Sequence, residues 1–299
     1  MILLLGYGFL GKSLAGFFKQ RSMPFSVADR NVHHLSEEHH VYFDLNDSDT
    51  YAAALTGIDT VIHLIHPTVP ADSDFSASVD LVHNLAANKR FLDYLPQTGV
   101  KRILYISSGG AIYGTPNYLP VDELHPCNPV SNYGKGKLLL EKLYQEKCMQ
   151  YGIQLTIIRP SNIYGQFQKT DKPQGVIAHL AEAFRENKPF VFWGDGTQQK
   201  DYLYIHDFAT AILAVLSNNE TASIHYNVSA GTSYTLPEII SIMESILHQK
   251  VQTSYAAAKR FDVKTVILSN EKFVHEFKWT AQYSLEEGLK DLLKPDRDL

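Results

Sequence analysis

The first half of the chain alternates short apolar runs with longer segments in which apolar residues recur at helical spacing. The short runs are aliphatic and β-branched without regular alternation, which is typical of strands covered on both faces of a sheet. After the first run, Leu10, Leu14, Phe17 and Phe18 form one apolar stripe of a helix. The pattern predicts strands at residues 2–5, 25–28, 40–43, 60–65, 102–106 and 154–158, and long helices at residues 75–95 and 132–151.

This order of elements favours a doubly wound α/β fold around a parallel sheet, because strands and helices alternate and parallel crossovers are right-handed. After residue 160 the segments become shorter and turn residues cluster at 166–173 and 194–197. We therefore expect a nucleotide-binding domain at residues 1–165 with a return segment near 201–228. A smaller C-terminal substrate lobe would comprise residues 166–200 and 229–299.

The C-terminal part contains three further predicted helices, at residues 207–216, 237–247 and 284–293. Thr235 precedes the second of them as a capping residue, with a proline in the first turn, where it is tolerated. Ser284 is the predicted N-cap of the last helix, and acidic residues follow it in the first turn.

Composition and charge narrow the class of protein. The 299 residues carry a formal net charge of −5 and no basic run, so we expect no nucleic-acid partner. Cys127 and Cys148 form no C-x-x-C pair, which favours reduced thiols in a cytoplasmic protein. The apolar residues 1–5 are too few to span a bilayer, and no longer apolar run occurs, so we expect no membrane contact.

Four histidines, His33, His34, His39 and His40, lie between the second and third predicted strands. No carboxylate pattern accompanies them that would orient metal ligands. We interpret this stretch as a solvated loop and expect no metal site.

A glycine-rich turn links the first predicted strand to the first helix. Its residues fit G-x-G-x-x-G and are Gly6-Tyr7-Gly8-Phe9-Leu10-Gly11. In this context the glycines allow a tight turn and close approach of a pyrophosphate, and the helix N-terminus supplies amides and a positive dipole end. We assign Gly6, Gly8, Phe9, Leu10 and Gly11 to dinucleotide binding.

The residues that follow the second predicted strand bear on the choice of dinucleotide. Asp29 ends that strand, where a carboxylate accepts both ribose hydroxyls of NAD. The neighbouring Arg30 could instead hold the 2′-phosphate of NADP. Asp29 would repel that phosphate, so the pair favours NAD, and NADP remains the alternative.

Tyr133 and Lys137 are four residues apart in a predicted helix, so their side chains share one face. A free tyrosine has a pKa of about 10, too high for a base at neutral pH. We expect the lysine charge and an oxidised nicotinamide ring to favour the phenolate. A second Y-x-x-x-K, from Tyr255 to Lys259, is far from the glycine loop in the sequence, and we interpret it as a surface pair.

With these motifs in view, the sequence resembles the extended short-chain dehydrogenase/reductases, and among them the NAD-dependent epimerase/dehydratase family that acts on nucleotide sugars. The resemblance covers nearly the whole chain and implies a Rossmann-type fold that binds NAD. Beyond the glycine loop and the Tyr–Lys pair, it rests on Asp44-Leu45, residues 59–64, Asn84, residues 107–114, 123–129, 159–165 and 193–202.

The resemblance also implies ligand contacts. Asp44, Leu45 and Leu64 would contact the cofactor, and Asn162 would reach the diphosphate of the sugar nucleotide. Lys200 stands where the family has an arginine, which keeps the charge but loses the bidentate fork. Residues 259–263 resemble a later R-x-G-D-V segment of the family, in which Lys259 takes the arginine's place in strict register. Arg260 beside it is favoured as the second candidate for the diphosphate because of its fork.

One departure from the family concerns the proton relay. Family members usually carry Ser or Thr five residues before the glycine that corresponds to Gly114. That position is Gly109 here, and Ala111 replaces a further hydroxyl. Ser108 is the favoured substitute, with Ser107 and direct proton transfer to Tyr133 as the alternatives.

The resemblance implies a nucleotide-sugar 4-epimerase. Tyr133 would take the proton of the C4 hydroxyl, and the C4 hydride would pass to NAD and return to the other face of a 4-keto sugar. Dehydratases of the family usually carry an Asp-Glu pair where this chain has Gly110 and Ala111, which disfavours dehydration. Alternatives are an NAD(P)H-dependent reductase of a 4-keto-deoxysugar nucleotide and a non-catalytic NAD-binding sensor. A homodimer through the helices at 75–95 and 132–151 is also expected.

Overall fold

The computed structural model describes residues 1–31, 40–65, 76–171, 174–218, 220–221, 224–256 and 263–294. Contacts within the chain define two compact units. The first comprises residues 1–108, 131–158 and 221–225, and the second comprises residues 109–130, 159–220 and 226–299. The division into a cofactor domain and a substrate lobe at residue 165 stays a prediction.

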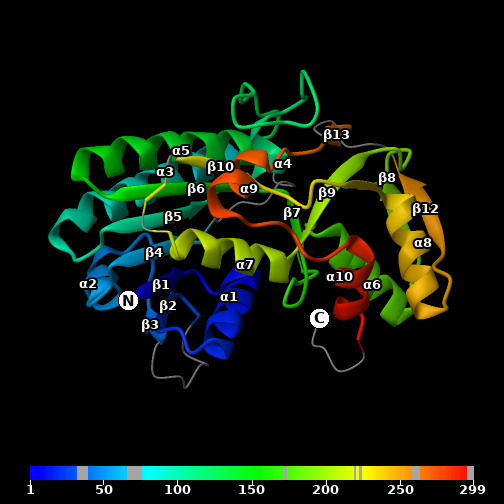
Figure 1. Cartoon of the computed structure of the whole chain (residues 1–299), viewed down its shortest axis with the longest axis horizontal. Coiled ribbons are helices and arrows are strands. Elements are labelled where there is room, and N and C mark those ends of the chain that lie inside the picture. The colour runs from blue at the N-terminus through cyan, green and yellow to red at the C-terminus, as the bar shows by residue number, and fades with distance from the viewer. Residues whose placement is uncertain are drawn as a thin grey trace. The chain divides into compact units, whose positions relative to one another are not determined.

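The first unit is built from alternating strands and helices (Figure 1). They are β1 (Ile2–Leu5), α1 (Phe9–Gln20), β2 (Phe25–Asp29), β3 (His40–Tyr42), α2 (Tyr51–Leu55), β4 (Thr60–His63), α3 (Ser76–Tyr94), β5 (Arg102–Ile106), α5 (Asn132–Tyr151) and β6 (Gln154–Pro160), the last of which runs into the second unit.

A seven-stranded sheet forms the core, in the order β10-β6-β5-β4-β1-β2-β3. Neighbours from β3 to β6 all pair in parallel, and β1 lies between β2 and β4. The chain therefore builds outward from β1, first to β3 and then, from β4, in the other direction. The predicted doubly wound α/β fold is confirmed.

The strands are apolar because both faces of the sheet are covered. Leu3, Val61, Ile103 and Ile157, from four different strands, have no exposed surface. The strand expected at 60–65 ends at His63, and the strand expected at 154–158 continues to Pro160. The helix expected at 132–151 has those bounds.

The second unit contains two smaller sheets, one of order β11-β9-β13 with β7 also on β9, and one of β8 and β12. Capping boxes at Thr235 and Ser284 confirm the two predicted helix starts. The elements of this unit are α4 (Gly109–Ile112), β7 (Asn162–Tyr164), α6 (Val176–Glu186), β8 (Phe190–Trp193), β9 (Gln199–Tyr204), α7 (Ile205–Leu216), β11 (Ser233–Thr235), α8 (Leu236–Leu247), β12 (Thr253–Ala256), β13 (Thr265–Val266), α9 (Glu271–Phe277) and α10 (Leu285–Leu292). Strand β10 (His225–Val228) begins in the first unit with His225 and runs into the second.

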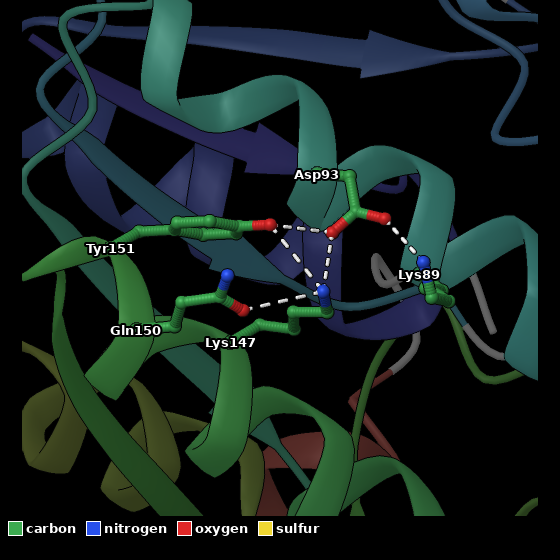
Figure 2. A network of polar contacts seen from close by, with 5 residues as sticks. All are labelled: Lys89, Asp93, Lys147, Gln150 and Tyr151. Carbon is green, nitrogen blue, oxygen red and sulfur yellow. Dashed lines mark hydrogen bonds and ion pairs between the residues drawn. The ribbon is translucent and has the colours of Figure 1, made fainter.

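Helices α3 and α5 pack side by side, and a polar network joins their C-terminal ends (Figure 2). Asp93 of α3 accepts hydrogen bonds from Tyr151 at 2.6 Å and from Lys89 at 2.5 Å, and lies 2.7 Å from Lys147 Nζ. Burial works in the other direction, but the hydrogen bonds from Lys147, Lys89 and Tyr151 hold the pKa of Asp93 well below its usual range. The network therefore stabilises the helix pair that carries Tyr133 and Lys137.

Replacing the central carboxylate should weaken this helix pair. We expect Asp93→Asn to lower the free energy of unfolding by about 1 kcal/mol, since it removes the charge from a partly exposed network. Because the folded pKa of Asp93 lies below its unfolded value, the difference from wild type should be present above about pH 4 and vanish as the pH falls through the folded pKa. Urea unfolding at several pH values measures it.

Glu286→Gln is the matched control for this measurement. Glu286 pairs with Lys290 across one turn of α10, and both side chains are more than half exposed. An exposed pair of this kind contributes at most about 0.5 kcal/mol. Equal losses in the two variants would show that the network adds nothing beyond a surface ion pair.

Candidate active site

The glycine loop between β1 and α1 has the geometry that its sequence predicts. Gly6 has a φ of +113°, which favours glycine, and its amide donates to Ala28 O at 2.9 Å. A Cβ on Gly11 would lie 2.1 Å from the carbonyl oxygen of Gly6. Only glycine permits this approach of the helix to the turn, so these two positions hold the loop in shape.

The N-terminus of α1 is open above this loop. Gly8, the N-cap, is exposed, and a Cβ there would meet no atom of the described residues within 4 Å. In the same part of the chain no side chain caps the helix, and its first turn contains no acidic residue. Phe9 and Leu10 are partly exposed in that turn. Available amides, a positive helix end and open space fit the pyrophosphate of a dinucleotide.

Asp29 lies at the C-terminal end of β2 and is bound to the loop. Its Oδ2 accepts from Tyr7 N at 2.8 Å and its Oδ1 from Asn31 N at 2.9 Å. Arg30 is exposed. The carboxylate is thus held beside the glycine turn, where it can meet a ribose, and its charge disfavours an added phosphate.

The other candidate cofactor residues lie near the carboxyl ends of neighbouring strands. Asp44 is half-buried and its Oδ1 accepts from Asn46 N at 2.9 Å. Leu45 is buried, and its carbonyl accepts from the Tyr51 hydroxyl at 2.5 Å. Leu64 follows β4, and its amide donates to Leu5 O at 2.9 Å. Asp44 and Leu45 follow β3, and since β1, β2, β3 and β4 are parallel, these ends meet at one edge of the sheet.

Helix α5 brings Tyr133 and Lys137 to the same edge. Ser131 caps the helix by accepting from Gly134 N at 3.1 Å. Lys137 is 4% exposed, and its Nζ donates to the carbonyl of Ile106, the last residue of β5, at 2.7 Å. The same Nζ lies 6.0 Å from the centre of the Tyr133 ring. The predicted shared face is confirmed.

Ser108 lies two residues beyond β5, and its hydroxyl is hydrogen-bonded to that of Tyr133. Ser107, in contrast, is buried, and its Oγ has no hydrogen-bond partner in the part of the chain that the structure describes. The structure therefore brings Ser108 together with Tyr133 and Lys137 and leaves Ser107 outside this group.

Burial dominates the ionisation of both catalytic candidates. It raises the pKa of Tyr133 to about 12, which the hydrogen bond from Ser108 partly offsets. It lowers the pKa of Lys137 to about 7, although the charge of Glu141 acts in the other direction. In the chain by itself, desolvation of the phenolate therefore sets the direction of the Tyr133 pKa, and the expectation that Lys137 together with an oxidised nicotinamide ring favours the phenolate stays a prediction.

The glycine at position 109 has a steric reason that the sequence did not reveal. A Cβ there would lie 2.3 Å from Leu268 Cδ1 and 3.0 Å from the carbonyl oxygen of Arg159. Leu268 is buried and pairs with Val121. The space that a serine or threonine side chain would need is therefore already filled by leucine.

The candidate substrate residues were expected near a diphosphate. Asn162 is exposed, and its Nδ2 donates to Asp201 O at 2.9 Å. The ammonium of Lys200, on β9, donates to the carbonyl of Val263. Arg260 lies outside the described residues, as does Lys259. Asn162 and Lys200 are on paired strands of the second unit, β7 and β9.

A buried network in the second unit includes a residue that sequence reasoning missed, Asn227. Its Oδ1 accepts from the Tyr113 hydroxyl at 2.8 Å, and its Nδ2 donates to Val121 O at 3.0 Å. Arg159 Nη1 donates to the same tyrosine at 3.0 Å, and Glu123 Oε1 accepts from Asn227 N at 2.7 Å. Several motif residues thus serve to hold one another, and no local pattern around Asn227 points to them.

The second tyrosine–lysine copy is on the surface where the structure describes it. Tyr255, on β12, is 68% exposed and stacks on Phe192 of β8. In the histidine stretch, His33, His34 and His39 lie outside the described residues, and His40 contacts the Tyr7 ring edge-on. Within the described residues no group of histidine, cysteine or acidic side chains could hold a metal ion.

A doubly wound sheet with an anion-binding glycine loop, and with a serine, a tyrosine and a lysine at the same edge, defines a Rossmann-type dinucleotide-binding protein of the short-chain dehydrogenase/reductase class. Residues 2–229 match the family model described as "NAD dependent epimerase/dehydratase family". The chain belongs to this family.

Similar proteins include enzymes of two reaction types. The chain is 28% identical to the dTDP-4-dehydro-6-deoxyglucose reductase of Escherichia coli over 98% of this chain and 96% of that protein. It is 25% identical to the UDP-glucose 4-epimerase of Mycolicibacterium smegmatis over 87% and 84%. The UDP-glucose 4-epimerase of Thermotoga maritima, solved with UDP-glucose, superposes with a TM-score of 0.89 at 25% identity, over 98% and 97% of the two chains.

The contact between Gly109 and Leu268 leads to a stability prediction. We expect Gly109→Ser to lower the free energy of unfolding by about 1–3 kcal/mol, since overpacking forces Leu268 to move. The same substitution in a Leu268→Ala background should cost less, because the cavity accepts the new side chain. Urea unfolding of the two single variants and the double variant measures this coupling.

Gly110→Ser is the control, since the nearest atom to a Cβ there is Asn162 Oδ1 at 3.6 Å, an ordinary contact distance. It should change stability by less than about 1 kcal/mol. Strict additivity of Gly109→Ser and Leu268→Ala would contradict the steric explanation.

Proposed function

We propose that this protein is an NAD-dependent nucleotide-sugar 4-epimerase that works through a transient 4-keto intermediate. The observation that carries the proposal is the joint placement of Ser108, Tyr133 and Lys137 at the sheet edge that also carries the glycine loop. The UDP-glucose 4-epimerases among the similar proteins support the reaction and the substrate class.

Each of these side chains has a part in the chemistry. Bound NAD would supply the acceptor, and then the donor, of the hydride on the sugar carbon. Tyr133 accepts the proton of the C4 hydroxyl, and Ser108 relays that proton or orients the hydroxyl toward the phenol. Lys137 stabilises the phenolate electrostatically and is held in place by the Ile106 carbonyl.

The remaining assignments concern binding. Gly6, Gly8, Phe9, Leu10 and Gly11 would hold the pyrophosphate, Asp29 the ribose, and Asp44, Leu45 and Leu64 the rest of the cofactor. Arg30 is exposed and would bind the 2′-phosphate if the cofactor were NADP. Asn162, Lys200 and Arg260 would contact the diphosphate of the substrate.

A second candidate function is the NAD(P)H-dependent reduction of a 4-keto-deoxysugar nucleotide. The similarity to the Escherichia coli reductase favours this second function, because the match covers nearly the full length of both chains. Reduction and epimerisation would use the same tyrosine and lysine, so these residues do not distinguish the two reactions. Net consumption of NADH or NADPH distinguishes them, because only the reductase uses up reduced cofactor.

Incubation with a panel of UDP-, dTDP- and GDP-hexoses and their 4-keto-6-deoxy derivatives tests the proposal. Formation of 4-epimers without net change in NADH supports the epimerase. Stoichiometric oxidation of added NADH or NADPH by a 4-keto sugar, without epimerisation of any hexose, would replace the proposal with the reductase. Tight NAD binding with no turnover of either kind would leave only the cofactor-sensing function.

We also infer a homodimer through α3 and α5. Val82 on α3 and Leu139 and Met149 on α5 are exposed apolar side chains on the helix pair where the family resemblance places the interface.

None of the described helices has the length and apolarity of a membrane span. A cytoplasmic location is part of the proposal and is supported by two cysteines that form no disulfide.

Removing the phenol hydroxyl should abolish most turnover. We expect Tyr133→Phe to lower kcat by about 100-fold to 10,000-fold, because the proton acceptor is lost, while NAD affinity and folding are retained. Tyr255→Phe is the matched control and should be nearly silent, since Tyr255 is on the surface. Steady-state kinetics of the two variants measure this, and comparable losses would refute the assignment of Tyr133.

Ser108 and Ser107 offer a matched pair for the relay. We expect Ser108→Ala to lower turnover by about tenfold to a thousandfold with little change in NAD affinity, because Ser108, unlike Ser107, is hydrogen-bonded to Tyr133. Ser107→Ala should leave turnover nearly unchanged. An unchanged rate for Ser108→Ala would mean that Tyr133 takes the proton directly.

A further inference from the structure

Helix α5 carries two almost completely buried charges of opposite sign. Lys137 is 4% exposed and Glu141, one turn later, is 1% exposed. Tyr133, Lys137 and Glu141 follow one another at intervals of four residues, so they lie along one face of the helix. Buried lysine and glutamate side chains are rare unless they are paired, and the proposed chemistry uses only the first two of these three residues.

Among the residues that the structure describes, the other neighbours of Lys137 are apolar or neutral. Its Nζ lies 5.2 Å from the centre of the Tyr105 ring and donates to the Ile106 carbonyl. Burial, and also the positive charge of Lys137, lower the pKa of His63 to about 3. The His63 imidazole is therefore neutral at neutral pH. Neither the aromatic ring nor a single carbonyl compensates a full buried charge, and the negative charge of Glu141, one turn away, favours the ammonium against burial.

Glu141 reaches toward the surface on its other side. Its Oε2 lies 3.7 Å from Nε2 of His225, the first residue of β10, whose side chain is 27% exposed. A partly solvated imidazole, a buried carboxylate and a buried ammonium thus form a line that ends at Tyr133. The titratable groups that face this line are Tyr133 and Tyr144 on α5, Tyr105 on β5, His63 on β4 and His225 on β10.

We propose that Glu141 is a positioning residue of the active site: its buried carboxylate keeps Lys137 charged beside Tyr133, and His225 holds that carboxylate from the solvent side. The proposal rests on the function proposed above, because it gives Lys137 the task of stabilising the Tyr133 phenolate. Glu141 contacts neither the sugar nor the cofactor and acts only through Lys137.

The ionisation of Lys137 shows which way the effect must go. Burial lowers the pKa of Lys137 to about 7, and the charge of Glu141 raises it from where burial alone would place it. Without Glu141 the ammonium loses its proton at a lower pH. The phenolate of Tyr133 then loses its counter-charge, so activity should fall at a lower pH on the alkaline side of its profile.

Carbon-13 NMR of the NAD-saturated protein, labelled at Cε of lysine, measures this ionisation without turnover. The Lys137 signal is assigned with Lys137→Met. We expect Glu141→Gln to lower the Lys137 titration midpoint by at least about one pH unit, the size expected for loss of a neighbouring opposite charge. Glu141→Met, which is neutral and apolar, gives the same reading if the glutamine variant does not fold.

Two controls separate charge from packing. Glu146→Gln, exposed on the same helix, should leave the Lys137 midpoint unchanged. Glu141→Asp keeps the charge but withdraws it by one methylene group, so the midpoint should fall by less than in Glu141→Gln. An unchanged midpoint in a folded neutral variant, or an equal fall in Glu141→Asp, would overturn the proposal.

The kinetic arm uses the pH dependence of kcat for epimerisation. The alkaline limb of Glu141→Gln should move to lower pH by the same amount as the NMR midpoint, with KM nearly unchanged and with rescue in Glu141→Asp. A uniform loss of kcat at every pH would indicate a merely structural role. A protein that turns over no nucleotide sugar but shows the midpoint shift would refute the proposed function and leave the link between Glu141 and Lys137 supported.

Discussion

Strand β1 pairs in parallel with both β2 and β4, and the candidate site depends on this double pairing. Because parallel strands end at the same edge, the turn after β1, Asp29 after β2 and Leu64 after β4 are delivered to one place. The close approach of Gly11 to the carbonyl of Gly6 then starts α1 at that edge. β5 extends the edge with Ser108, and α5 covers it with Tyr133 and Lys137.

Burial has opposite consequences at the two catalytic candidates. It raises the pKa of Tyr133 and lowers the pKa of Lys137, so burial favours the neutral form of each side chain. A phenolate–ammonium pair must therefore be maintained by specific partners: Ser108 on the phenol, Ile106 O on the ammonium and the charge of Glu141 behind it. A low dielectric environment makes these few contacts strong, which is why a small number of groups can suffice.

Three residues of the family's motifs form hydrogen bonds inside the protein. Tyr113, Arg159 and Glu123 belong to a network around Asn227 in the second unit. Their hydrogen bonds satisfy polar groups that burial would otherwise leave costly. A motif can thus reflect the requirements of a buried network as much as contact with a ligand, and the residue type alone does not tell the two apart.

The sequence by itself determined the order and type of the main elements, the doubly wound sheet and the glycine loop. Those features follow from apolar periodicity and from local turn chemistry, which act over a few neighbouring residues. The helix bearing Tyr133 and Lys137, and the capping boxes at Thr235 and Ser284, are local in the same sense.

Only the tertiary structure decided which hydroxyl accompanies Tyr133, why position 109 is glycine and what faces the buried lysine. Ser107 and Ser108 are adjacent in sequence, and the turn of the chain after β5 sends one into the core and the other to the tyrosine. Leu268 and His225 reach their partners from far along the chain. Such contacts depend on how distant segments pack, and desolvation sets the pKa of Tyr133 and Lys137 only once that packing exists.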